Sequence, residues 1–245
     1  MPVITANTPL RDIVTVNPAA AQVFDGFDID YFCRGGRPLG DALKEKNVSF
    51  DAFTGELARM DFGKIQPWSC AWNTAPLQEL MAHIVDTYHE YLRTEMPTLE
   101  DSLAQIKSEL VPSEHVFQDL RHMVHSLRRD LELQMRKEEA ILFPAIAELA
   151  VSPLRDGPQQ SSQFGSVANL SRVMGKDHEK VASVMHQIRL MTNNIPPPQK
   201  VPALKMCFDR LQSLSLTMHH HAHLEINILY PRAIELEKGK DHGSK

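Results

Sequence analysis

Hydrophobic residues recur at three- and four-residue steps in four long stretches after Pro76, a pattern that predicts four amphipathic helices. The stretches cover residues 76–110, 113–149, 165–192 and 200–237. We expect Pro97 to bend or break the first of them, because a proline inside a helix removes a backbone hydrogen bond. Long amphipathic helices with short connections favour an up-down bundle. The sequence therefore predicts an all-α protein with a four-helix bundle over residues 76–240.

Residues 1–62 form a separate, smaller helical pattern. One helix is expected from Asn17-Pro18 to Phe24, with Asn17 as N-cap and Pro18 in the first helical position. Two more are expected over residues 39–46 and 49–61, the second capped by Ser49 or Asp51. The segment 63–75 contains Gly, Pro and two Trp residues, and we interpret it as a linker between the two domains.

A short motif occurs twice in the bundle, once in the second helix and once in the fourth. Glu138 begins EEAILFP and Glu225 begins EINILYP, so both fit E-x-x-I-L-[FY]-P. The bundle is thus interpreted as two helical hairpins of related design. In each copy a carboxylate directly precedes an apolar run, where a charge needs a partner.

Composition excludes several classes of protein. The chain has 245 residues, 42% of them hydrophobic, and a formal net charge of -5 without a Lys/Arg block, which argues against a nucleic-acid partner. It has no run of 18 apolar residues, so no membrane span is expected, and its first residues do not resemble a signal peptide. Three scattered cysteines do not form a disulfide framework, which favours the cytoplasm.

A candidate metal site begins with His221 and Glu225, which lie four residues apart and therefore on one face of the fourth helix. Imidazole and carboxylate together suit iron, manganese or zinc. A solvated polar stripe would give the same local pattern. The other three helices favour the metal, because each also offers a candidate ligand beside apolar residues. These candidates are His83, Glu138 and His178.

As a set, these residues resemble the iron–sulfur cluster repair di-iron family, the RIC or YtfE/ScdA group. The resemblance covers nearly the whole chain, and DIDYFCRGG in the small domain resembles the family's cysteine-bearing ScdA-type motif. Within the bundle it is carried by His83-Ile84 with His89, Lys137-Glu138-Glu139, Asp177-His178-Glu179, His221-x-x-x-Glu225 and both I-L-[FY]-P runs.

The resemblance implies a hemerythrin-like bundle that holds two irons, bridged by oxygen and by Glu138 and Glu225. His83, His178 and His221 would be the terminal imidazole ligands. It also implies repair of iron–sulfur clusters after nitric oxide or oxidative stress, by iron donation or NO chemistry. The expected partners are damaged iron–sulfur proteins or cluster-assembly proteins, with NO or O₂ as small ligands. A homodimer is compatible with this scheme.

Two departures from the family pattern matter. The family has H-x-x-x-E in the second helix as well, but here Gln134 stands in the place of the histidine. The internal repeat places Gln134 opposite His221 in the same way. A neutral amide oxygen is a harder and weaker ligand than imidazole, so occupancy of the iron on the Gln134 side is in question.

The second departure lies in the small domain, where Phe32 replaces the first of two adjacent cysteines and only Cys33 remains. Arg34 and Arg37 lie close to Cys33 in sequence, and positive charge raises the thiolate fraction of a cysteine. Cys33 is therefore the candidate reactive residue, although a bystander thiol in a turn fits the same residues.

Two functions from different classes remain at the level of sequence. The first is the cluster repair implied by the resemblance, with any enzymatic activity directed at NO. The second is a sensor or scavenger that binds O₂ or NO at an incomplete, one-iron site. Hydrolase and dehydrogenase chemistry has no support, because the sequence contains no phosphate loop, dinucleotide fingerprint or Ser/His/Asp arrangement.

Overall fold

The computed structural model describes residues 4–16, 20–27, 29, 31, 35–59, 72–106, 113–151, 165–194 and 202–242. Within them the protein is helical, and the only β-type pairing is an isolated bridge between Pro9 and Pro38. Backbone contacts group the chain into two compact units: Met1–Pro76 with Ala222–Pro231, and Leu77–His221 with Arg232–Lys245. The expected all-α class is confirmed.

The N-terminal part of the chain contains four short helices: α1 (Leu10–Val16), α2 (Ala20–Gly26), α3 (Leu39–Glu45) and α4 (Phe50–Arg59). Aromatic residues form its centre, where the ring of Phe24 lies 5.3 Å from that of Tyr31 and 4.9 Å from that of Phe53. The hydroxyl oxygen of Ser49 accepts the backbone N–H of Ala52 at 3.1 Å, so Ser49 caps α4 as expected.

The helix α1 is absent from the sequence-based prediction, which placed the first helix at Asn17. Leu10, Ile13 and Val14 are nearly fully buried, and their spacing is that of one helical face. Three apolar residues are too few for a periodic pattern to stand out. The cysteine-bearing turn at Cys33 and most of the expected linker 63–75 lie outside the described residues.

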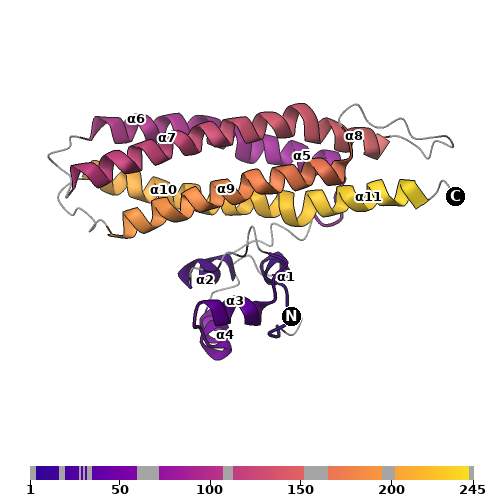
Figure 1. Cartoon of the computed structure of the whole chain (residues 1–245), viewed down its shortest axis with the longest axis horizontal. Helices are drawn as coiled ribbons and strands as arrows, with labels where there is room; N and C mark the ends of the chain where they lie inside the picture. Colours follow the sequence, from indigo (N-terminus) through magenta and orange to yellow (C-terminus); the bar gives the residue numbers. More distant parts are fainter. Residues whose placement is uncertain are drawn as a thin grey trace. The chain divides into compact units, whose positions relative to one another are not determined.

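Four long helices make up the rest of the fold, as expected (Figure 1). Three of them contain a π-helical segment with wider turns than an α-helix. The first helix consists of α5 (Leu77–Ile84), η1 (Val85–His89) and α6 (Glu90–Gln105); the second of α7 (Glu114–Lys137), η3 (Glu138–Leu142) and α8 (Phe143–Val151); the third of α9 (Val167–Asn194); the fourth of α10 (Pro202–Ala222), η4 (His223–Leu229) and α11 (Tyr230–His242).

The break expected at Pro97 does not occur, because α6 continues through this residue. Packing explains its persistence: on either side of Pro97 the side chains of Leu92, Met96, Leu99 and Leu103 are almost fully buried. Their burial offsets the backbone hydrogen bond that the proline removes. No described helix is both long and apolar enough to cross a lipid bilayer.

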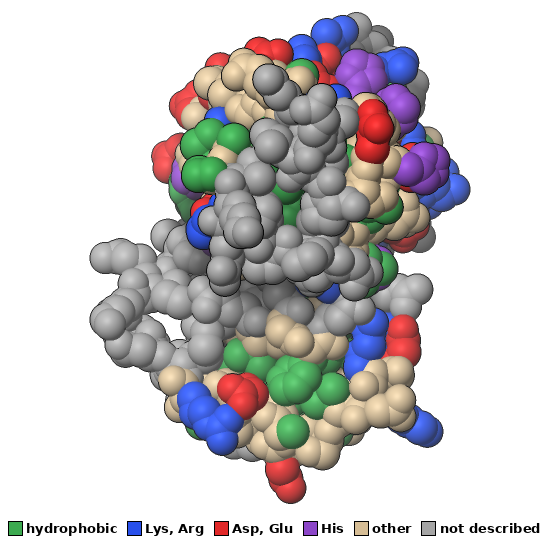
Figure 2. Space-filling model, turned by 90° about the vertical axis from the view of Figure 1, so that its left-hand side faces the viewer, with side chains coloured by type: hydrophobic (Ala, Val, Ile, Leu, Met, Phe, Trp, Pro, Cys, Tyr) green, Lys and Arg blue, Asp and Glu red, His purple; other side chains and the backbone are tan. Residues whose placement is uncertain are grey.

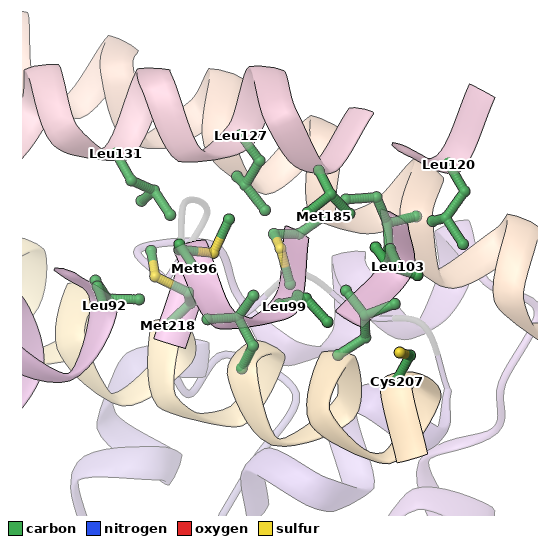
Figure 3. Packing of buried hydrophobic residues seen from close by; sticks show 14 of the residues in the cluster. Leu92, Met96, Leu99, Leu103, Leu120, Leu127, Leu131, Met185, Cys207 and Met218 are labelled. Carbon is green, nitrogen blue, oxygen red and sulfur yellow. The ribbon is translucent and has the colours of Figure 1, made fainter. Parts of the chain in front are cut away.

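Leucine and methionine side chains fill the interior of the bundle (Figure 3). They come from α6, α7, α9 and α10 and point toward one another, and Cys207 lies among them, fully buried. Burial raises the pKa of the Cys207 thiol, so this residue serves packing rather than thiolate chemistry. The apolar interior gives way to polar side chains at one level of the bundle, and that level is the candidate site.

Candidate metal centre

In each of the four helices, buried polar side chains replace buried apolar ones at the same spacing from the apolar core. The last buried apolar residues before it are Leu92, Met135, Val181 and Met218. Three positions from each of these, the buried residue is polar: His89, Glu138, His178 and His221, respectively, all 0% exposed. Inward carboxylates and imidazoles on facing helices are how bundles hold metal ions.

Four of the buried side chains form a compact cluster: His89, Glu138, His221 and Glu225. Each offers one ligand atom, and these atoms all lie within 4.8 Å of one another. The Nε2 atoms of His89 and His221 are 3.1 Å apart, and Nε2 of His89 lies 3.4 Å from Oε2 of Glu138. Two imidazoles and two carboxylates are a donor set for iron, manganese or zinc.

The repeated motif determines the local backbone of both glutamates. The backbone N–H of Phe143 donates to the carbonyl oxygen of Glu138, and that of Tyr230 donates to the carbonyl oxygen of Glu225. Both bonds span five residues, which is the π-helical pattern. Each is followed at once by a proline, Pro144 or Pro231, which has no N–H to continue the α-helical pattern. The sequence repeat is thus a repeated π-helical turn that carries an inward glutamate.

His89 is oriented by a carboxylate outside the cluster. Its Nδ1 lies 2.6 Å from Oε1 of Glu139, and Glu139 also accepts two hydrogen bonds from Arg93 at 2.6 and 2.8 Å. A carboxylate can only accept, so Nδ1 of His89 carries a hydrogen, and in the neutral ring Nε2 then presents a lone pair to the cluster. Burial raises the pKa of Glu139, but hydrogen bonds from His89 and Arg93 outweigh it and the pKa is lowered.

Aromatic rings cover both imidazoles of the cluster. Tyr88 stacks on His221 with ring centroids 5.6 Å apart, and Phe143 stacks on His89 at 6.0 Å. Burial raises the pKa of Tyr88 to about 12, which keeps its phenol neutral beside the cluster. These rings exclude water, and a low local dielectric strengthens the attraction between the carboxylates and a cation.

His178 and Gln134 lie on the other side of Glu138. Nε2 of Gln134 is 3.1 Å from Oε1 of Glu138 and 2.8 Å from Nε2 of His178. Oε1 of Glu138 lies 4.0 Å from Nε2 of His178. The two oxygens of Glu138 therefore face different neighbours, His89 with Oε2 and the Gln134–His178 pair with Oε1.

The structure brings together three of the five metal ligands expected from the sequence: Glu138, His221 and Glu225. His178 contacts this group through Glu138. His83 is not in the cluster; its Nδ1 lies 3.1 Å from the hydroxyl of Thr87, and its pKa is lowered by burial, against the charge of Asp86. Cys33, the expected reactive residue, lies outside the described residues.

His89 is the cluster member that the sequence analysis did not name as a ligand. The sequence could have indicated His89. The buried residues Leu103, Leu99, Met96 and Leu92 follow one face of the helix at steps of three and four, and His89 is three residues before Leu92. Burial separates the cluster imidazoles from the exposed histidines, although His223 is also fully buried and is not one of the four cluster residues. The side chains of His115 and His125 are 90% and 64% exposed, and other histidine side chains are visible at the surface in Figure 2.

The residues present fit a metal ion. Glu138 and Glu225 bring two carboxylates into a fully buried cluster, where mutual repulsion and loss of hydration are costly unless a cation compensates them. The lone pair of His89 is already fixed toward the same space. Bundle and cluster together define a hemerythrin-like, metal-binding protein.

Comparison with known proteins agrees with this class. The family model described as the hemerythrin HHE cation binding domain matches residues 80–233, and ScdA_N, a domain of unknown function, matches residues 6–61. Proteins named "Iron-sulfur cluster repair protein YtfE" are similar over 227 residues, which is 92% of this chain and 96% of theirs. Identity is 30% for that of Escherichia coli O81 and 29% for that of Citrobacter koseri. The chain belongs to the iron–sulfur cluster repair (RIC) family.

Proposed function

We propose that this protein repairs iron–sulfur clusters damaged by nitric oxide or oxidative stress, and that it does so with a non-haem di-iron centre in its helical bundle. The buried cluster of His89, Glu138, His221 and Glu225 is the observation that carries the proposal. Relatives named for cluster repair match 92% of the chain, including the part that contains all four residues.

In the proposed centre, Glu138 and Glu225 would each contribute a carboxylate to both irons. His89 and His221 would hold one iron, and His178 would hold the other. His83 is the remaining imidazole of the sequence-based set. It is not among the four cluster residues, so His89 is the better candidate for that role. Iron bound here supplies redox and NO-binding chemistry, and it is also the material that a damaged cluster lacks.

Cys33 is proposed to act outside the bundle. Arg34 and Arg37 near it in sequence favour the thiolate, which is a ligand for iron. We propose that Cys33 receives iron or contacts the damaged protein. The proposed partners are iron–sulfur proteins with damaged clusters or cluster-assembly proteins, and a second copy of the chain would place two such thiols in one assembly.

The test uses a purified [4Fe–4S] enzyme inactivated by NO. Iron-loaded wild type should restore its activity, and Glu225→Gln should restore far less because a bridging carboxylate is lost. Glu235→Gln alters an exposed glutamate on the same helix and should behave as wild type. For the thiol, Cys33→Ser is compared with Cys70→Ser. Failure of iron-loaded wild type to restore activity, with the iron still bound, would refute the repair function.

The second candidate function is reversible binding of O₂ or NO as a sensor or scavenger. The observation in its favour is Gln134, which leaves the second metal position without an imidazole from the second helix. A spectrum that changes with NO and returns on its removal, while iron stays bound and no cluster is restored, would favour this function over repair.

A further inference from the structure

Gln134 forms hydrogen bonds to the residues that would hold the second metal ion of the centre. It is 1% exposed, and its amide group points at Glu138 and His178. These two residues are the ones that a second metal ion would need. The amide N–H groups of Gln134 therefore interact with the same two atoms, Oε1 of Glu138 and Nε2 of His178, that would bind such an ion.

The tautomer of His178 supports this arrangement. Its Nδ1 lies 2.9 Å from the carbonyl oxygen of Met174, which can only accept a hydrogen bond, so Nδ1 carries the ring hydrogen. In the neutral ring Nε2 of His178 then carries the lone pair, and the amide of Gln134 donates to it at 2.8 Å. The same lone pair would bind a metal ion, so amide and ion compete for one atom.

The oxygen of the Gln134 amide is buried, and within the described part of the chain no group donates a hydrogen bond to it. A half-turn of the amide about its last side-chain bond exchanges nitrogen and oxygen. The oxygen would then face Glu138 and His178 as a third donor for an ion. It is a neutral donor, and the turn gives up two hydrogen bonds, so this position binds an ion less strongly than a cluster with two imidazoles.

We propose that the centre holds two metal ions unequally. The tight ion is bound by His89, His221 and the two shared glutamates, Glu138 and Glu225. The weak ion is bound by His178, the turned amide of Gln134 and the same two glutamates. This inference rests on the proposed di-iron function and adds the order of iron release: the ion on the Gln134 side dissociates first. Glu138 joins the two positions because its Oε2 faces one and its Oε1 the other.

An anaerobic titration of the metal-free chain with Fe(II) alone, in competition with a graded chelator, tests the inequality. In wild type the second ion should bind at least about tenfold more weakly than the first, which corresponds to about 1.4 kcal/mol. Gln134→His restores an imidazole and should tighten the second ion by about tenfold or more while leaving the first nearly unchanged.

Gln134→Leu removes the amide without adding a donor and should abolish the second ion alone. Gln134→Glu keeps the size of the side chain and provides a charged oxygen, so it should also tighten the second ion if the histidine variant does not fold. Gln78→His adds an imidazole at an exposed position of α5 and is the matched control. Thermal unfolding of each metal-free variant verifies its fold.

Two equally tight ions in wild type would overturn the inference, as would a second ion whose affinity is the same in all Gln134 variants. Either result leaves the metal centre itself intact. A chain that binds no Fe(II) tightly, in wild type and in Gln134→His alike, would refute the proposed function as well. The titration therefore separates failure of the inequality from failure of the centre.

Discussion

Glu139 holds His89 through a 2.6 Å hydrogen bond from the ring Nδ1, and Arg93 in turn holds Glu139. The imidazole is thereby fixed with Nε2 toward the buried glutamates before any metal binds. We expect Glu139→Ala to weaken metal binding by about 10- to 100-fold, the range for partners that orient a ligand. Glu139→Gln keeps an acceptor for Nδ1 and should recover part of the loss.

The measurement is the Fe(II) affinity of the tight position, and Glu235→Gln, at an exposed site, is the control. If Glu139→Ala bound Fe(II) as wild type does, the orienting role of Glu139 would be wrong. Rescue by glutamine separates orientation from a general loss of stability, which unfolding experiments on the metal-free variants measure directly.

The prolines of the repeat offer a second prediction. Pro144→Ala and Pro231→Ala restore the backbone N–H that an α-helical pattern needs, so the π-helical turns at Glu138 and Glu225 should relax toward α-helix. The glutamates would then turn away from the cluster, and affinity for Fe(II) should fall while the helical circular dichroism signal stays. Pro97→Ala is the control, since α6 is α-helical around Pro97. Unchanged affinity in the Pro144→Ala, Pro231→Ala double variant would contradict this account.

Stability at high pH depends on Tyr88. Its pKa is raised to about 12 by burial, so the folded protein retains a proton that the unfolded chain loses near pH 10. The contribution of Tyr88 to the free energy of unfolding is complete below pH 10 and is lost as the pH rises toward 12. We expect Tyr88→Phe to show a smaller loss of unfolding free energy between pH 9 and 11 than wild type, in urea titrations of the metal-free protein. Equal losses would rule out this role for Tyr88.

Substitutions in the apolar core should change the stability of the protein without changing its affinity for metal. Leu99 is fully buried in the apolar part of the bundle (Figure 3), and Leu99→Ala should lower the free energy of unfolding by about 2–5 kcal/mol. Leu190 is 48% exposed, and Leu190→Ala should change it little. Both folded variants should bind Fe(II) with wild-type affinity, and a large loss of affinity in Leu99→Ala would show that the site depends on the whole core.

Periodicity predicted the helices well because each one buries a long stripe, but it failed where a stripe is short or a turn is widened. The helix α1 rests on only three buried apolar residues, and the sequence-based prediction omitted it. The π-helical turn Val85–His89 changes the helical phase between His83 and His89. The apolar residues beside His83 in sequence favoured that histidine, whereas counting back three positions from the buried Leu92 reaches His89.

Glu138 and Glu225 could be predicted because each begins one copy of the repeat, and His221 because it lies one helical turn before Glu225. The repeat also exposed Gln134 as the departure from symmetry. The hydrogen bond of Gln134 to Glu138 joins residues one turn apart on the same helix, but the bond to His178 could not be predicted, because it depends on how side chains from two helices meet. The same holds for Glu139, whose pairing with His89 and Arg93 joins two helices.

The central claim is that the buried histidine and glutamate cluster binds iron, and iron content tests it most directly. Wild type, Glu225→Gln and the control Glu235→Gln are loaded anaerobically with Fe(II), freed of unbound metal, and analysed by atomic emission. The account predicts up to two irons per chain in wild type and in the control, the second lost first on washing with chelator, and a clear loss in Glu225→Gln. Wild type that retains no iron, or Glu225→Gln that retains as much as wild type, would contradict it.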